Sequence, residues 1–182
     1  MTKQALESLP VAVIGGGPVG LAAAAHLVDR GVPVQQFEAV AAVAPASLVD
    51  FGRRLTAIAE FAALPEAEAL AAANKRIRNI LRKAEGEIPE KVSRARLIEE
   101  AEVALAESVE SAIRETDGAL AQGDYIAVLK RLAWLRQPVD AFFDGVMVMA
   151  EDEAIRENRL ALLKRLADRF AAVAAVEQLS VG

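Results

Sequence analysis

Three glycines near the N-terminus have the spacing of a phosphate-binding turn. Gly15, Gly17 and Gly20 form a Gly-x-Gly-x-x-Gly motif between the apolar run 11–14 and the alanine-rich stretch 21–30. The first glycine of such a turn permits a tight bend, the second lets a pyrophosphate approach the backbone, and the third lets a helix pack closely against a strand. The N–H groups at the start of that helix then bind the phosphates. The chemistry that this motif predicts is dinucleotide binding.

A carboxylate stands where a dinucleotide-binding turn would use one. Glu38 lies about 20 residues past the motif, at the end of the run Val32–Glu38, which we expect to be a second strand. There it would accept a hydrogen bond from a ribose hydroxyl. Strand, turn, helix and strand together predict a small βαβ unit. The alternative is a unit that packs but binds nothing, because two parallel strands leave a sheet face and both edges uncovered.

An expected helix in the middle of the chain carries a basic face. From Pro65 to about Ala84 the apolar residues recur at helical spacing, and no acidic residue interrupts the run between Glu68 and Glu85. The face opposite the apolar stripe gathers cations, which attract phosphates even when the whole chain is acidic. The plainer alternative is a solvated face stabilised by ion pairs, for which acidic partners are missing inside the run. The candidate polyanion-binding residues are Asn74, Lys75, Arg76, Arg78, Asn79, Arg82 and Lys83.

The composition limits the kinds of protein this can be. Of 182 residues, 54% are hydrophobic but only 4% aromatic, and alanine supplies much of the difference, so a mostly helical fold is expected. The absence of cysteine excludes disulfides and thiolate chemistry, and the single histidine, His26, gives no basis for a zinc site. No apolar run approaches the ~18 residues of a membrane span, and no signal peptide is recognisable, so we expect a cytoplasmic protein with no membrane partner.

Two pieces of unequal size would position the candidate residues. Residues 1–46 are expected to form the incomplete, Rossmann-like βαβ unit and a linker. Residues 47–182 are expected to form a bundle of five to six helices. The predicted fold class is therefore mainly α, with a small N-terminal βαβ unit.

The bounds of the helices follow from capping and helix-breaking residues. Asp50 is expected to cap a helix that runs to about Leu64, and Asp124 one that runs to about Leu135. A long helix is expected to begin near Arg94.

The C-terminal part of the chain supplies apolar packing and two carboxylates. Asp140 and Asp144 stand four residues apart on one helical face, but no base, metal ligand or nucleophile accompanies them. We therefore expect them to cap a helix or to pair with Arg159. The expected core residues of this part are Phe142, Val146 and Met149, with a stripe of Ile155, Leu162, Leu163, Leu166, Phe170 and Val173 in the last helix.

Two long strings in the helical part resemble one known family. ALAAANKRIRNIL and PVDAFFDGVMVMAEDEAIRENRLALL resemble, in order and spacing, the C-terminal region of the bacterial glycyl-tRNA synthetase β subunit, from near Leu48 almost to the end of the chain. The resemblance implies a DALR-type helical anticodon-binding domain, with glycine tRNA as the partner of the basic set between Asn74 and Lys83. It also implies a partner α subunit that holds the catalytic site for glycine and ATP. No catalytic residue, metal or cofactor is then expected in this chain.

The N-terminal string resembles a different family. VAVIGGGPVGLAAAAHL, followed by FEA, resembles the first βαβ unit of FAD-dependent oxidoreductases and monooxygenases. This resemblance implies FAD bound through Gly15, Gly17, Gly20 and Glu38. A third hypothesis is a folded fusion of two fragments that retains neither activity. The uncovered strand edge of a βαβ unit would also let two copies pair, so a homodimer is a further expectation.

Overall fold

The computed structural model describes residues 31–180, and all regular structure in this range is helical. Six α-helices follow residue 47, within the predicted five to six, so the prediction of a mainly α fold is confirmed. None of these helices is both long and apolar enough to cross a membrane. In chain order the elements are α2 (Val34–Ala41), α3 (Leu48–Ala62), α4 (Ala67–Lys83), η2 (Arg94–Arg96), α5 (Glu100–Gln122), α6 (Tyr125–Ala133), α7 (Arg136–Gly145), α8 (Glu153–Ala171) and η3 (Val176–Leu179), where η marks a 3-10 helix.

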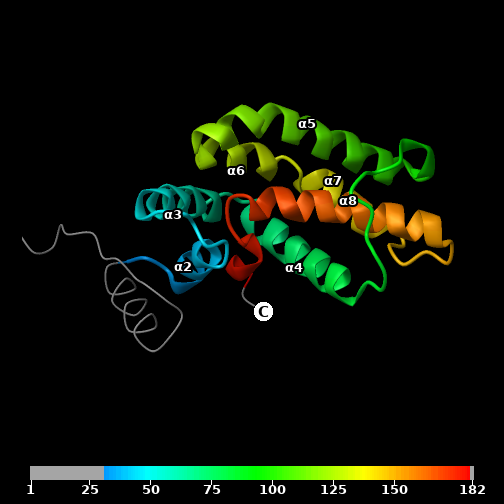
Figure 1. Ribbon diagram of the computed structural model, residues 1–182, viewed down its shortest axis with the longest axis horizontal. Helices are drawn as coiled ribbons and strands as arrows, with labels where there is room; N and C mark the ends of the chain where they lie inside the picture. The colour runs from blue at the N-terminus through cyan, green and yellow to red at the C-terminus, as the bar shows by residue number, and fades with distance from the viewer. Residues whose placement is uncertain (1–30, 181–182) are drawn as a thin grey trace, which may run out of the picture.

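Helix α8 lies at the centre of the bundle. Figure 1 shows it between α4 and α5, and it packs against both. Most of its residues are buried, as expected of a helix that is enclosed on more than one side. The ring of Phe170 meets that of Phe61 from α3, with 6.2 Å between the ring centroids. The predicted stripe is confirmed as core at Leu162, Leu163, Leu166, Phe170 and Val173, whereas Ile155 is half-buried.

Aspartates begin two of the helices. Asp124 accepts a hydrogen bond from the N–H of Ala127 at 3.1 Å and so caps α6, as predicted. Asp152 caps α8 in the same way through the N–H of Ile155, at 3.0 Å. These side chains satisfy backbone donors that have no partner within the helix.

Helix α3 begins earlier than predicted. Its cap is Ser47, whose hydroxyl accepts the N–H of Asp50 at 3.1 Å, so the assignment of Asp50 as the cap is wrong. The carboxylate of Asp50 instead accepts hydrogen bonds from Arg54 and from the hydroxyl of Tyr125, on α6. Arg54 also donates to the carbonyl oxygen of Ala172, at 2.8 Å, and so ties α3 to the end of α8. The carboxylate of Asp50 therefore makes tertiary contacts and does not cap the helix.

Helix α5 begins later than predicted. Arg94 starts only a short 3-10 turn, and the α-helix begins at Glu100. The carboxylate of Glu102 accepts the N–H groups of Ile98 and Glu99, at 3.0 and 2.8 Å. These bonds occupy the backbone donors just before the helix and define its first turn.

The predicted second strand is wrong, because residues 34–41 form α2. Pro33 precedes the helix with extended backbone angles. Val34, Phe37 and Val40 recur at intervals of three residues, which places them on one helical face, whereas a strand would need alternation. The ring of Phe37 packs on Phe51 of α3, with 5.4 Å between the centroids.

The dinucleotide-binding hypothesis required a second strand at residues 32–38, and the structure has a helix there. Glu38 lies exposed on α2, not at the end of a strand, and residues 32–38 provide no strand edge for a homodimer. Gly15, Gly17 and Gly20 lie outside the described residues, as does His26. The division of the chain into two domains at residue 46 stays a prediction. Helix α2, which lies before this boundary, packs against α3 and η3, which lie after it.

A buried ion pair joins α5, α8 and the segment between α7 and α8. Arg159 Nε lies 2.6 Å from Glu102 Oε1, and both side chains are almost fully buried. Arg159 also donates to the carbonyl oxygen of Met147 at 2.8 Å. Burial alone would raise the pKa of Glu102, but the hydrogen bonds from Arg159 and from the N–H groups of Glu99 and Ile98 hold the pKa below its usual value.

The Glu102→Gln variant should unfold at a much lower urea concentration than the unmodified chain. Arg159 would keep its charge in a buried place without a counter-charge, which costs about 3–5 kcal/mol. The control is Glu60→Gln, which breaks an exposed pair with Lys130 and should cost under about 1 kcal/mol. Equal losses for the two variants in urea denaturation would contradict this account.

Candidate nucleic-acid interface

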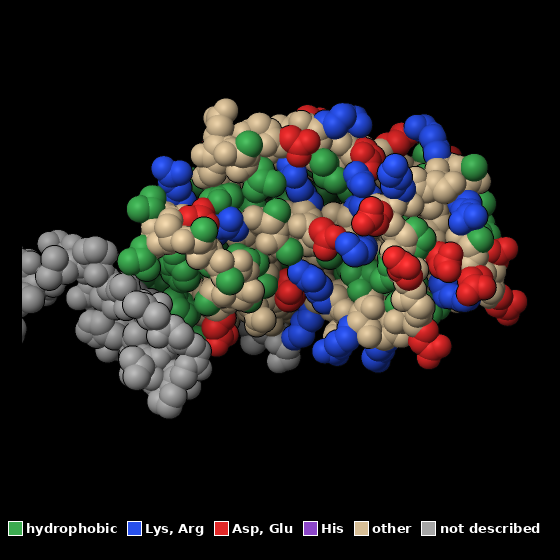
Figure 2. Space-filling view, in the orientation of Figure 1, with side chains coloured by type: hydrophobic (Ala, Val, Ile, Leu, Met, Phe, Trp, Pro, Cys, Tyr) green, Lys and Arg blue, Asp and Glu red, His purple; other side chains and the backbone are tan. Residues whose placement is uncertain are grey.

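The basic side chains predicted on α4 are exposed for the most part. Figure 2 shows Lys and Arg side chains gathered over α4 and toward its C-terminal end. Lys75, Arg76, Asn79, Arg82 and Lys83 are exposed. We call these five residues the α4 basic surface. Four of them, all but Arg82, line an open groove of about 370 Å³ together with Ala72 and Ile80.

Two members of the α4 basic surface are oriented by neighbouring side chains. The guanidinium of Arg76 lies 4.1 Å from the centre of the Phe143 ring on α7, a cation–π contact. Arg82 donates to the side-chain oxygen of Asn79 at 3.0 Å. The side chain of Ile80, which also lines the groove, is half-buried. The groove thus combines cations with the apolar side chains of Ala72 and Ile80, and the aromatic ring of Phe143 lies against one of these cations. Cations beside aromatic rings are a combination that binds single-stranded nucleic acid.

The other two predicted residues contact the end of the chain. Asn74 is 2% exposed and donates to Glu177 of η3 at 2.7 Å. Arg78 is half-buried and its Nε lies 3.4 Å from the same carboxylate. The structure therefore places five of the seven predicted residues on one face and turns Asn74 and Arg78 toward η3. Sequence reasoning missed Glu177 because it lies about a hundred residues away along the chain.

The prediction for Asp140 and Asp144 is wrong, because neither carboxylate caps a helix among residues 31–180 and neither pairs with Arg159. Asp140 instead lies 3.4 Å from Arg136, one turn earlier in α7. Arg159 instead forms an ion pair with Glu102. The packing predictions hold for Phe142 and Val146, whereas Met149 is 53% exposed.

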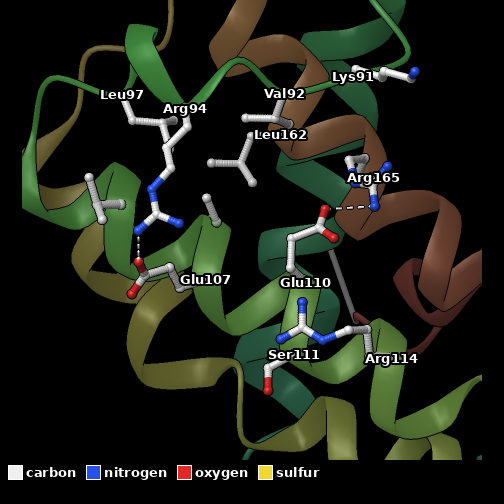
Figure 3. Close-up of a pocket in the computed structure, with 12 residues that line it drawn as sticks. Lys91, Val92, Arg94, Leu97, Glu107, Glu110, Ser111, Arg114, Leu162 and Arg165 are labelled. Atoms are coloured by element: carbon white, nitrogen blue, oxygen red, sulfur yellow. Dashed lines mark hydrogen bonds and ion pairs between the residues drawn. The ribbon is translucent and has the colours of Figure 1, made fainter.

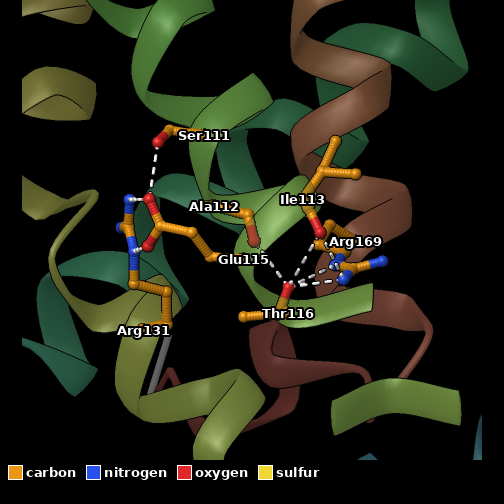
Figure 4. Close-up of polar contacts among 7 residues, drawn as sticks. All are labelled: Ser111, Ala112, Ile113, Glu115, Thr116, Arg131 and Arg169. Carbon is orange, nitrogen blue, oxygen red and sulfur yellow. Dashed lines mark hydrogen bonds and ion pairs between the residues drawn. The ribbon is translucent and has the colours of Figure 1, made fainter. Parts of the chain in front are cut away.

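A second set of polar contacts joins α5 to α6 and α8 (Figure 4). Glu115 accepts a hydrogen bond from Arg131 at 2.5 Å and one from Ser111 at 2.6 Å. On the other side of α5, Arg169 donates to the hydroxyl of Thr116 and to the carbonyl oxygen of Ile113. The hydrogen bonds from Arg131 and Ser111 lower the pKa of Glu115 to about 2. These contacts orient α6 and α8 on α5, and α8 in turn packs against α4.

The Asn74→Ala variant should lose stability, because Asn74 is buried and bonded to a charged group. A loss of about 1–3 kcal/mol is expected from the broken bond, although Glu177 would keep its ion pair with Arg78. Lys75→Ala, on the exposed side of the same helix, should change stability by no more than about 0.5 kcal/mol. Thermal unfolding of the two variants separates a structural Asn74 from a surface residue, and a neutral Asn74→Ala would contradict the assignment.

Glu115 should titrate near pH 2 in the folded chain. Its folded pKa of about 2 lies below the ordinary 4.5, so the stabilising pair with Arg131 is complete above the ordinary pKa and is lost as the pH falls toward 2. Nuclear magnetic resonance of the carboxyl carbon would follow this titration. Arg131→Gln should move the midpoint back toward the ordinary value, and an unchanged midpoint would refute Arg131 as the cause of the lowered pKa.

Comparison with known proteins assigns a family to this arrangement. The model of the DALR anticodon binding domain matches residues 70–176, which include α4 from Leu70 onward and all of α5 to α8. The chain is similar to proteins named glycine--tRNA ligase beta subunit. It is 63% identical over 155 residues to that of Xanthomonas campestris pv. campestris (strain B100) and 54% identical over 155 residues to that of Xylella fastidiosa (strain M12). It is 50% identical over 151 residues to that of Vibrio cholerae serotype O1 (strain M66-2).

Each of these matches covers most of this chain but only a small part of the relative. The Xanthomonas match takes 85% of this chain but 22% of the relative, so this chain spans about a fifth of the length of the curated relatives. The Xanthomonas match is 155 residues long, and fewer residues than that lie between Leu48 and the end of the chain. The match therefore begins before Leu48, where the resemblance noted from the sequence began. The family model covers more than half of the residues, and the chain belongs to the DALR anticodon binding domain family.

Proposed function

We propose that this chain is the anticodon-binding module of a glycine–tRNA ligase β subunit. In this role it binds glycine tRNA and supports aminoacylation without holding the catalytic site. The observation that carries the proposal is the α4 basic surface, which lies within the segment matched by the family model. The relatives named above add the identity of the tRNA, since each is named as a glycine–tRNA ligase β subunit.

The geometry of α4 suits contact with an RNA backbone. Lys75, Arg82 and Lys83 are exposed, and among residues 31–180 none of the three forms an ion pair with a carboxylate. Their charges are therefore available to phosphates, and binding would release the counterions condensed on the RNA. Arg76 and Phe143 form a fixed cation–π pair beside them, which offers a flat surface to an unstacked base. Asn74 and Arg78 contribute indirectly, because their contacts with Glu177 hold α4 against η3.

In the same proposal, the catalytic site lies in a separate α subunit. The relatives are β subunits, and this chain corresponds to a fifth of one of them. Assembly with an α subunit would supply the chemistry on glycine and ATP. A cytoplasmic location accords with this role. FAD has no part in the proposal, because the residues expected to form the second strand of its binding unit form α2.

Reversal of a single charge on α4 should weaken binding of glycine tRNA. Lys75→Glu should lower the affinity about tenfold and reduce the slope of log affinity against log salt by about 1, because one phosphate contact is lost. The matched control is Lys130→Glu on α6, an equally exposed lysine outside the groove, which should stay within about twofold. Fluorescence anisotropy with labelled tRNA at two salt concentrations gives both quantities.

Three results of this titration would argue against the proposal. Failure of the unmodified chain to bind would favour a folded domain without retained activity. Equal loss from Lys75→Glu and Lys130→Glu would show that net charge, and not α4, governs binding. Equal affinity for glycine tRNA and for a tRNA with another anticodon would remove the anticodon from the account.

A further inference from the structure

A second concave surface lies on a different part of the molecule from the α4 groove. It is a cavity of about 780 Å³ enclosed by α5, α8 and the loop that joins α4 to α5 (Figure 3). This volume lies within the ~300–1,000 Å³ range of ligand-binding pockets. Its floor is apolar and includes Val92, Leu97 and Leu162. Its rim is charged.

The rim carries more positive than negative charge. Four cations and two carboxylates line the cavity. The carboxylates pair with two of the cations, Glu107 with Arg94 at 2.5 Å and Glu110 with Arg165 at 2.6 Å. The other two cations, Lys91 and Arg114, form no ion pair among residues 31–180. Arg165 Nε is buried and has no hydrogen-bond partner in that range. The cavity therefore retains the positive charge of Lys91 and Arg114 for an anionic ligand.

The loop wall of the cavity is held in place by buried polar groups. The side chain of Asn158, on α8, accepts the N–H of Ser93 at 2.6 Å and donates to the carbonyl oxygen of Ser93 at 3.1 Å. At the other end of the wall, Glu102 accepts the N–H groups of Ile98 and Glu99. Burial of polar groups is unfavourable unless they are bonded, and here the bonds fix loop backbone. A wall that is ordered before binding lowers the entropic cost of binding.

We propose that this cavity receives one unstacked nucleotide of the anticodon loop. The inference rests on the proposed function, because single-stranded loops are the parts of RNA whose bases can leave the stack and enter a pocket. The base lies on the apolar floor formed by Val92, Leu97 and Leu162. Its phosphate contacts Lys91 and Arg114 at the rim. The carboxylates suit a base better than an acidic peptide, because exocyclic amino groups of a base donate to carboxylates.

The path of the chain links this cavity to the α4 basic surface. Arg82 and Lys83 end α4, and the loop that follows carries Lys91 and Arg94 to the rim. Figure 1 shows this loop running from the end of α4 past α8 to the start of α5. Contact between η2 and α8 holds the loop close to α8. One loop therefore joins the α4 basic surface to the cavity, and it also carries the exposed carboxylates of Glu85, Glu87 and Glu90.

The test uses the full chain and labelled RNA stem-loops that contain the anticodon loop of glycine tRNA. Each loop position is made abasic in turn. With the unmodified chain, loss of one base should weaken binding by about tenfold, the effect expected of one stacked base. Arg114→Ala should weaken binding of the intact RNA by a similar factor. Lys130→Ala, an exposed lysine on α6, is the control and should leave the affinity unchanged.

The combination of the two changes identifies the cavity. If the base occupies it, the abasic substitution at the sensitive position should cost much less in Arg114→Ala than in the unmodified chain, because the two changes remove parts of one interaction. Additive losses, or no loss from Arg114→Ala, would overturn the cavity assignment while leaving α4 binding intact. No binding by the unmodified chain would overturn the proposed function and this inference together. Equal melting temperatures of the variants would establish that each is folded.

Discussion

The buried ion pair between Glu102 and Arg159 joins segments that are distant in the sequence. It joins the first turn of α5 to the central helix α8, and it extends to the carbonyl oxygen of Met147 and to the N–H groups before α5. A buried pair is not a strong source of stability compared with apolar packing, because both charges lose their hydration. Its value lies in geometry, since a displaced partner would leave a charge unpaired. Glu102 holds one end of the loop wall of the cavity, and Asn158 holds the other.

Local patterns predict the parts of the fold that depend on neighbouring residues. The predicted cap Asp124 acts within one helical turn, and the apolar stripe of α8 reflects a helix enclosed by its neighbours. The predicted start of α5 is wrong because Glu102 accepts the N–H groups of Ile98 and Glu99 and so defines the first turn. The predicted start of α3 is wrong because Ser47 is its cap, while Asp50 bonds to Tyr125 on α6. The prediction of a strand at 32–38 depends on its valines and on the glycine-rich turn that precedes it. The spacing of three in this segment is a helical signal, and its apolar face lies against α3.

The candidate site is predictable in part for the same reason. The uninterrupted cations of α4 are visible in the sequence, and five of the seven predicted residues are exposed on that helix. The contact of Asn74 and Arg78 with Glu177 is tertiary and has no local signal. The cavity between α5 and α8 could not be predicted either, because its cations come from three separate segments. One signal was available: Asn158 and Arg159 interrupt the buried side of α8 with polar residues, which need partners inside the fold.

Helix α4 of this acidic chain is the element proposed to contact the anticodon loop of glycine tRNA. A net charge of −5 makes the position of the cations more important than their number. Figure 2 shows one group of Lys and Arg side chains over α4, and further ones mixed with acidic side chains on the rest of this face. Ultraviolet cross-linking of the chain to glycine tRNA, followed by mass spectrometry of the linked peptides, tests this contact most directly. We expect links between peptides from residues 75–83 and nucleotides of the anticodon loop. Links confined to α3 or α6, or to the acceptor stem of the tRNA, would contradict it.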